Sequence, residues 1–373
     1  MKASLEQELH QWVDAGVIDQ QTADRIRAFE SSPKPPGLRW PAVLAIAFGA
    51  IMVGAGVLLF VAAHWEDLSP TQRFLLVLIM VTGFHLAAGA LMPRMRPLGV
   101  ALHGVGTVAL GAGIFLAGQI FNLQEHWPGG ILLWAVGAAL AWWVLRDWLQ
   151  ATFAALLIPA WIASEWIVRA QHFHGADIML VQFLTLLAIT YLSAFREGDD
   201  SYFRRALKWS GGMALLPLAA ILAAEGGRGW YRSQMPISLR AAGYVMALLL
   251  PLLAAWLLRR RTAVWNVAFG VWVFILGLVN SSDIFGEMAI YALCALGAVG
   301  LVYWGLEERR RERINLGVAG FAITIMVFYF SSVMDKLGRS ASLVGFGLLF
   351  LLGGWKLEQL RRKLVARTAG GAR

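Results

Sequence analysis

Residues 98–127 read LGVALHGVGTVALGAGIFLAGQIFNLQEHW. The segment carries no formal charge before Glu125, and its apolar part is long enough to cross about 30 Å of hydrocarbon. Its glycines fall on two heptad lines, which are Gly99, Gly106 and Gly113, and Gly104, Gly111 and Gly118. At roughly 100° per residue these lines lie on nearly opposite sides of a helix, where small residues let neighbours approach closely. The segment therefore predicts a central transmembrane helix that ends in a polar mouth.

The composition places most of the chain in lipid. Of 373 residues, 58% are hydrophobic and 15% are charged, whereas a soluble domain carries about 25% charged residues. The net charge of +9 is spread between hydrophobic segments and forms no single stripe, so we expect no nucleic-acid partner. The lone Cys294 excludes an internal disulfide and a CxxC motif. Nucleotide-binding glycine motifs in their strand–helix context are absent, and we expect no cofactor.

The first 39 residues are mostly polar and argue against a cleaved signal peptide. Residues 1–30 predict a cytoplasmic two-helix appendage, in which Gly16 stops the first helix and Asp19 caps the second. Such a pair buries too little to be stable alone, so we expect it to dock on the membrane domain or on a cytoplasmic protein partner. Residues 31–39 form a proline-rich linker, 40–358 the transmembrane domain and 359–373 a basic cytoplasmic tail.

From residue 40 on we count twelve apolar segments, which predict an all-α polytopic transmembrane helix bundle of about twelve helices. Their spans are 40–63, 74–92, 98–120, 129–145, 148–168, 177–195, 206–224, 241–258, 263–282, 287–306, 314–334 and 340–357. With the amino terminus inside, the inner segments collect 25 of the 32 Lys and Arg residues and the outer loops keep seven. That bias is the one that the positive-inside rule predicts, and it places both termini in the cytoplasm.

The outer loop after the first apolar segment holds His64, Glu66 and Asp67. A histidine beside two carboxylates can bind a divalent cation or relay protons. No HxxxH or HExxH spacing is present, so we predict no metal site. The alternative is an interfacial loop in which Trp65 anchors at the lipid headgroups and the residues before Pro70 cap the next helix.

A second group of polar residues follows the glycine-rich segment: Gln119, Asn122, Glu125 and His126. Spacings of three and four put three of them on one helix face, where they could line a cavity with His64 and Glu66. The alternative is a satisfied helix terminus. Glu165 lies near the outer end of segment 148–168, and an ionisable group at that depth is a candidate for function. Its expected partner is Arg169 or His172, although a simple interfacial pair with Arg169 is the competing interpretation.

Two histidines lie inside apolar segments. His85 and His103 are seven and five residues from the inner ends of segments 74–92 and 98–120, at similar heights on antiparallel neighbours. They are a candidate proton-relay pair, and the alternative is a hydrogen-bonded structural role.

Several stretches carry a resemblance to a known family. They are HQWVDAGVIDQQTADRI (10–26), HWEDLSPTQR (64–73), GAGIFLAGQIFNL (111–123) and ILLW (131–134). Over residues 5–145 the chain resembles a bacterial family of predicted membrane proteins, domain of unknown function family 2157, and residues 313–340 look like the end of related multi-pass proteins. The resemblance implies a multi-pass protein of the bacterial inner membrane. It implies no activity and therefore no catalytic residues.

The leading functional hypothesis is transport or handling of a small molecule or lipid through a polar cavity open to the outer face. Its expected partners are the lipid bilayer and that unknown small molecule or lipid. One alternative is a membrane-embedded enzyme that acts on a lipid-linked or envelope substrate, with carboxylates as acid or base. A second is a membrane scaffold or sensor that signals through the amino-terminal helices.

Overall fold

The computed structural model describes residues 9–31, 68–120, 126–173, 175–194, 201–225, 235–279 and 284–333, with scattered positions in 45–59 and 347–359. Throughout this part of the chain the regular structure is helical and contains no strand. The chain divides into two compact units, of which the first is residues 1–66 with 87–102 and the second is residues 67–86 with 103–373.

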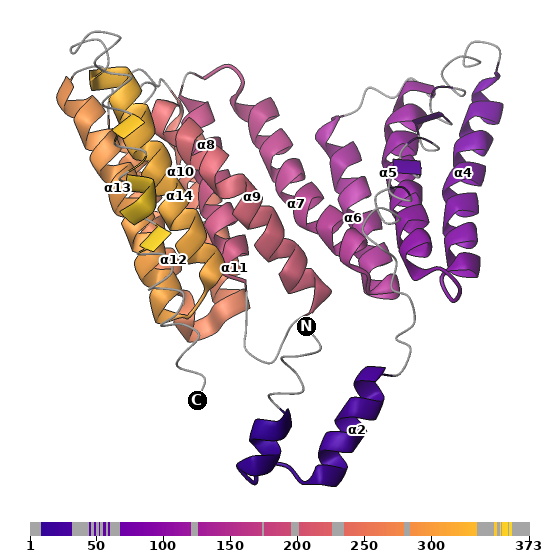
Figure 1. Ribbon diagram of the computed structural model, residues 1–373. Coiled ribbons are helices and arrows are strands. Elements are labelled where there is room, and N and C mark those ends of the chain that lie inside the picture. Colours follow the sequence, from indigo (N-terminus) through magenta and orange to yellow (C-terminus); the bar gives the residue numbers. More distant parts are fainter. Residues whose placement is uncertain are drawn as a thin grey trace. The chain divides into compact units, whose positions relative to one another are not determined.

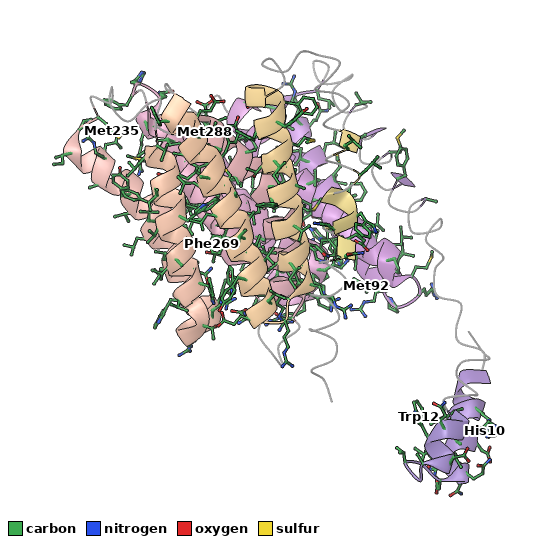
Figure 2. The ribbon with its side chains drawn as sticks, turned by 60° about the vertical axis from the view of Figure 1, so that its left-hand side comes forward. His10, Trp12, Met92, Met235, Phe269 and Met288 are labelled. Atoms are coloured by element: carbon green, nitrogen blue, oxygen red, sulfur yellow. The ribbon has the colours of Figure 1, made fainter. Side chains whose placement is uncertain are left out.

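In the first unit, residues 9–14 are helical and helix α2 (Gln20–Ser31) follows (Figure 1). Gly16 adopts a φ of +66° between them, a conformation that glycine reaches without the strain of a Cβ. The Asp19 side chain accepts a hydrogen bond from the Thr22 backbone N–H at 2.8 Å, which is the predicted cap. Leu9 and Ala23 are buried, whereas His10 and Trp12 on the short first helix are exposed (Figure 2). The start of that helix lies outside the described residues.

Apart from residues 87–91 of α4 and 96–102 of α5, the helices after α2 belong to the second unit. The first four in chain order are α4 (Pro70–Leu91), α5 (Arg96–Ile120), α6 (Pro128–Leu145) and α7 (Trp148–Ala170). They are followed by α8 (Ala176–Leu192), α9 (Tyr202–Glu225), α10 (Ile237–Tyr244), the π-helix η2 (Val245–Leu249), α11 (Leu250–Arg259) and the 3₁₀ turn η3 (Arg260–Ala263). The last are α12 (Val264–Leu278), α13 (Ile284–Glu307), α14 (Arg311–Phe328) and the π-helix η4 (Tyr329–Val333). Helices α10, η2 and α11 follow one another without interruption and form one helical span, Ile237–Arg259.

Eight helices of the described residues are long and apolar enough to cross a membrane. Helices α8 and α12 are apolar but shorter, with 17 and 15 residues. These ten coincide with ten of the predicted segments, and the predicted segments 40–63 and 340–357 lie mostly outside the described residues. The predicted total of about twelve spanning helices is therefore not confirmed.

The glycines of α5 give it two close-packed faces, as their spacing predicts. A Cβ on Gly106 or Gly113 would collide with His85 or Val77 of α4. On the other side, a Cβ on Gly104 would collide with Leu149, and one on Gly111 with Trp134. Each glycine thus makes room for a side chain of a neighbouring helix, which is how small residues bring membrane helices together.

The most buried helix is α8, and the expectation that α5 holds the central place is wrong for the described part of the chain. Most α8 side chains are buried, from Ile178 to Leu192, whereas α5 exposes Val108 and Phe115. The Gln182 amide donates to the Val273 carbonyl at 3.3 Å, and the Thr190 hydroxyl donates to the Pro251 carbonyl at 3.2 Å. Buried polar groups of this kind tie apolar helices together.

One end of the α8–α14 bundle is held by arginines, and we call it the arginine-rich end (193–194, 201–204, 258–263 and 308–313). Arg204 donates to the carbonyls of Ala194 and Leu258 at 2.6 and 3.2 Å. Arg259 donates to the Ser193 carbonyl at 2.9 Å and also bonds Glu308. Figure 2 shows Met235 and Met288 towards the opposite end, with Phe269 between the two ends.

Candidate functional site

The predicted histidine pair is formed. The Nδ1 atoms of His85 on α4 and His103 on α5 are 2.8 Å apart, and their ring centroids are 5.1 Å apart. His103 is only 4% exposed and His85 is half-buried. The expectation that these residues face each other from antiparallel helices is confirmed.

Local sequence explains how the two rings fit. Gly106 lies close to one turn after His103, and a Cβ there would stand 2.8 Å from Nε2 of His85. Glycine at this position therefore leaves the space that the His85 ring occupies. The backbone carbonyl of His103 accepts a hydrogen bond from the Thr107 hydroxyl at 3.1 Å, one turn further along α5.

A chain of hydrogen bonds runs from the backbone carbonyl of His103 towards α6 and α7. The Thr107 hydroxyl also donates to Oε1 of Gln150 at 2.8 Å, so its single proton is shared between two acceptors. The indole N–H of Trp134 donates to the Thr107 carbonyl at 2.8 Å and fixes this turn of α5 against α6. Gln150 is fully buried, with 0% of its surface exposed.

Asp147 lies next to Gln150 at the start of α7. It caps α7, because its Oδ1 accepts the backbone N–H of Gln150 at 2.8 Å, and it is only 5% exposed. The other carboxylate oxygen, Oδ2, and the Gln150 Nε2 are buried without a protein partner. We call these five residues, His85, His103, Thr107, Asp147 and Gln150, the polar cluster.

The geometry of the pair defines its proton chemistry. A neutral imidazole carries one N–H, so between two facing Nδ1 atoms there is room for one proton. When the outer Nε2 of one ring takes up a proton, that ring can pass its Nδ1 proton to the other ring, which then releases its own Nε2 proton. The net result is one proton moved from one side of the pair to the other. A second added proton would place two N–H groups face to face and open the contact.

A second pair of titratable residues, His126 and Glu165, lies near the start of α6 and the end of α7. Nε2 of His126 is 2.9 Å from Oε1 of Glu165, and Nη2 of Arg169 is 3.2 Å from Oε2. The Trp161 indole N–H donates to Oε1 at 3.3 Å. The predicted Arg169 partner is confirmed, whereas His172 instead lies 3.4 Å from the Gln171 amide. The carboxylate is therefore held by one cation, one histidine and one indole.

The other predicted positions are only partly described. Gln119 is exposed at the end of α5. Asn122, Glu125, His64, Glu66 and Asp67 lie outside the described residues, so Gln119 and His126 are the described residues of these two predicted polar groups. Among the described residues, no three His, Cys, Asp or Glu side chains gather as metal ligands would.

Our reading of the sequence missed Thr107, Asp147 and Gln150. A signal for two of them was present: Asp147 followed three residues later by Gln150 at the start of an apolar run is a helix-capping pattern. That pattern predicts the cap but not its burial, which depends on how α5 packs against α6 and α7.

Comparison with known proteins supports the resemblance. No curated protein and no solved structure matches the chain. The family described as "Predicted membrane protein (DUF2157)" matches residues 10–151, a region that contains the whole polar cluster but not Glu165. With its long apolar helices, the chain is a membrane protein, and its residues 10–151 are similar to the DUF2157 family of predicted membrane proteins.

Proposed function

We propose that the protein transports or handles a small molecule or lipid in the bacterial inner membrane, and that the polar cluster binds and passes the proton that is coupled to this activity. The observation that carries the proposal is the 2.8 Å contact between Nδ1 of His85 and Nδ1 of His103 inside two apolar helices. Ionisable groups within a membrane are unfavourable unless they are paired or hydrated, and they mark proton and solute pathways.

The unpartnered atoms support the same proposal. Asp147 Oδ2 is an acceptor and Gln150 Nε2 is a donor, and both are buried without a protein partner. A water molecule, or a polar group of a solute, would satisfy them and would lie next to the Thr107 hydroxyl.

The distribution of basic residues gives the orientation of the protein in the membrane, and with it the two ends of the proposed proton pathway. The positive-inside rule places the arginine-rich end in the cytoplasm, together with both termini. The polar cluster then lies towards the cytoplasmic ends of α4–α7, and the His126–Glu165 pair lies towards the outer face. In this proposal Glu165 and His126 exchange protons with the outside and the polar cluster exchanges them with the inside.

Proton uptake into liposomes tests the proposal without knowledge of the solute. The full chain is reconstituted with a pH-sensitive dye inside, and a potassium gradient with valinomycin supplies the driving potential. We expect His103→Gln to slow uptake by at least about tenfold. The matched control is His172→Gln, since His172 is an exposed histidine away from the cluster. Equal uptake by wild type, His103→Gln and empty liposomes would refute proton transfer through the pair.

A deletion separates this proposal from the scaffold or sensor alternative. Removal of residues 1–36 takes away the amino-terminal helices and leaves every residue of the polar cluster. We expect the shortened protein to retain proton uptake, because the pathway lies in the membrane helices. Loss of uptake at normal protein abundance would favour signalling through the amino-terminal helices.

A further inference from the structure

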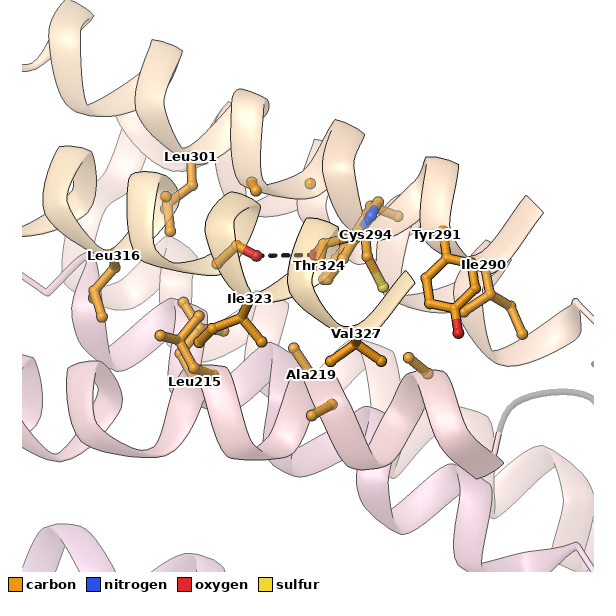
Figure 3. Close-up of a pocket in the computed structure, with 18 of the residues that line it drawn as sticks. Leu215, Ala219, Ile290, Tyr291, Cys294, Leu301, Leu316, Ile323, Thr324 and Val327 are labelled. Atoms are coloured by element: carbon orange, nitrogen blue, oxygen red, sulfur yellow. Dashed lines mark hydrogen bonds between the residues drawn. The ribbon is translucent and has the colours of Figure 1, made fainter. Parts of the chain in front are cut away.

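A second feature of the second unit shares no residue with the polar cluster. Helices α9, α13 and α14 enclose a cavity of about 530 Å³ (Figure 3). That volume falls within the range of small-molecule sites, about 300–1,000 Å³. Leu215 and Ala219 form the α9 wall, while Leu301 of α13 and Ile323 of α14 close it from the other side.

Small side chains give the cavity its width. The α9 wall is made largely of alanines, and glycine or alanine recurs on the facing walls. These residues are Ala219, Ala220, Ala223 and Ala224 on α9, Gly297 and Ala298 on α13, and Gly317 and Gly320 on α14. The Thr324 hydroxyl, midway along, donates to the Gly320 carbonyl at 2.9 Å. Its proton is therefore already used within α14, and the middle of the cavity is essentially apolar.

One end of the cavity differs from the rest. Glu287 and Tyr291 line it there, and the Tyr291 hydroxyl is 3.3 Å from Oε1 of Glu287 and 2.5 Å from the Ser331 hydroxyl. At the other end the lining is Leu301 and Leu316. From residue 287 to residue 301 helix α13 rises about 21 Å, at 1.5 Å per residue. The cavity is thus long and apolar, with Glu287 and Tyr291 at one end.

We propose that this cavity binds one acyl chain of a bilayer lipid. A long apolar slot within membrane helices matches a hydrocarbon tail, which gains dispersion contacts along its whole length. The Glu287 carboxylate disfavours a free fatty acid, whose own carboxylate would face a like charge. The occupant is therefore an esterified lipid.

The test uses a phosphatidylcholine that carries a photoactivatable diazirine in its acyl chain. The full-length protein is assembled with this lipid in nanodiscs, illuminated, digested and mapped by mass spectrometry. We expect adducts on the facing surfaces of α9, α13 and α14, including Cys294, the single cysteine of the chain, which lines the cavity. Adducts restricted to outward-facing positions would overturn the proposal, as would occupation by the chain's own segment 340–357, which would exclude lipid adducts from the cavity walls.

Two variants sharpen this test. Cys294→Phe fills the cavity and should reduce the wall adducts several-fold. Leu296→Phe adds similar bulk to the same helix at a position that is 63% exposed and does not line the cavity, so it should leave them unchanged. Equal labelling of the two variants would contradict an acyl-chain site. The wild-type adduct map stands independently if Cys294→Phe does not fold, and Ala220→Phe then serves as the second filling variant.

Discussion

His85 and His103, 18 residues apart in sequence, bring their Nδ1 atoms to 2.8 Å across the α4–α5 hairpin. Glycine at position 106 leaves room for the contact, and the His103 backbone carbonyl begins a chain of hydrogen bonds that leads through Thr107 and Gln150 to the buried Asp147. The contact admits one proton between the rings. The proposed proton transfer depends on this contact between the two rings.

Gly106→Ala should disturb the pair. The added Cβ would stand 2.8 Å from Nε2 of His85, and such overpacking costs about 1–3 kcal/mol. We expect a lower melting temperature in nanodiscs and slower proton uptake. Gly83→Ala on α4 is the control, because a Cβ there meets nothing within 4 Å. If both variants melt and conduct alike, the glycine does not position His85.

Gln150→Leu should separate function from stability. It removes a buried amide whose Nε2 has no protein partner, so stability should stay within about 1 kcal/mol of wild type or rise. Proton uptake should slow, because the link from Thr107 to the cap of α7 is lost. Gln171→Leu, at an exposed position, should change neither. Strong destabilisation with normal uptake would assign Gln150 a purely structural role.

Glu308→Gln should destabilise the arginine-rich end. Glu308 bonds Arg259, Arg313 at 2.6 Å and the Trp304 indole at 2.7 Å. Removing one partner from a buried ion pair costs about 3 kcal/mol. The neighbouring Glu307→Gln is the control, since Glu307 bonds only the Trp265 indole among the described contacts. Thermal unfolding should show a clear loss for the first variant and little for the second.

The same carboxylate predicts a pH dependence of stability. Burial raises the pKa of Glu308, but the hydrogen bond from Arg259 and the charge of Arg313 outweigh it, so the pKa lies below its ordinary value of 4.5. A depressed folded-state pKa means that the stabilisation is fully present above pH 4.5 and is lost as the pH falls through the lower folded value. Wild type should therefore lose stability relative to Glu308→Gln in that acidic window. Parallel melting curves at all pH values would contradict this.

Glu165→Ala should slow proton entry at the other end without lowering membrane abundance. The substitution removes the partner of both His126 and Arg169. Asp177→Ala is the matched control, because Asp177 is an exposed residue in the first turn of α8. We expect uptake in the liposome assay to fall by about tenfold or more for the first variant only. Unchanged uptake would remove Glu165 from the pathway and leave it an interfacial ion pair.

Much of the helix layout could be predicted because its signals are local. The predicted segment 148–168 is α7, from Trp148 to Ala170, and its start is set by the Asp147 cap. The central place of α8 could not be predicted, because lipid is as apolar as a protein interior and hydropathy does not distinguish a helix that faces lipid from one that faces its neighbours.

In the candidate site, too, some contacts could be predicted from the sequence and others could not. The heights of His85 and His103 on neighbouring antiparallel helices could be counted along the chain, so their contact was predictable. The meeting of Thr107 with Gln150 joins α5 to α7 across 43 residues, and no spacing in the sequence encodes it. The Glu165 pair with Arg169 follows from the helical period, whereas the approach of His126 depends on how α6 packs against α7.

The most direct measurement is nuclear magnetic resonance of the full chain in nanodiscs with its seven histidines labelled with ¹⁵N. The account predicts a coupling through the hydrogen bond between Nδ1 of His85 and Nδ1 of His103, which disappears in His85→Gln and persists in His172→Gln. It also predicts that the two rings titrate as one unit rather than independently. Independent titration of His85 and His103, with no coupling between their Nδ1 atoms, would contradict the shared proton on which the proposed function depends.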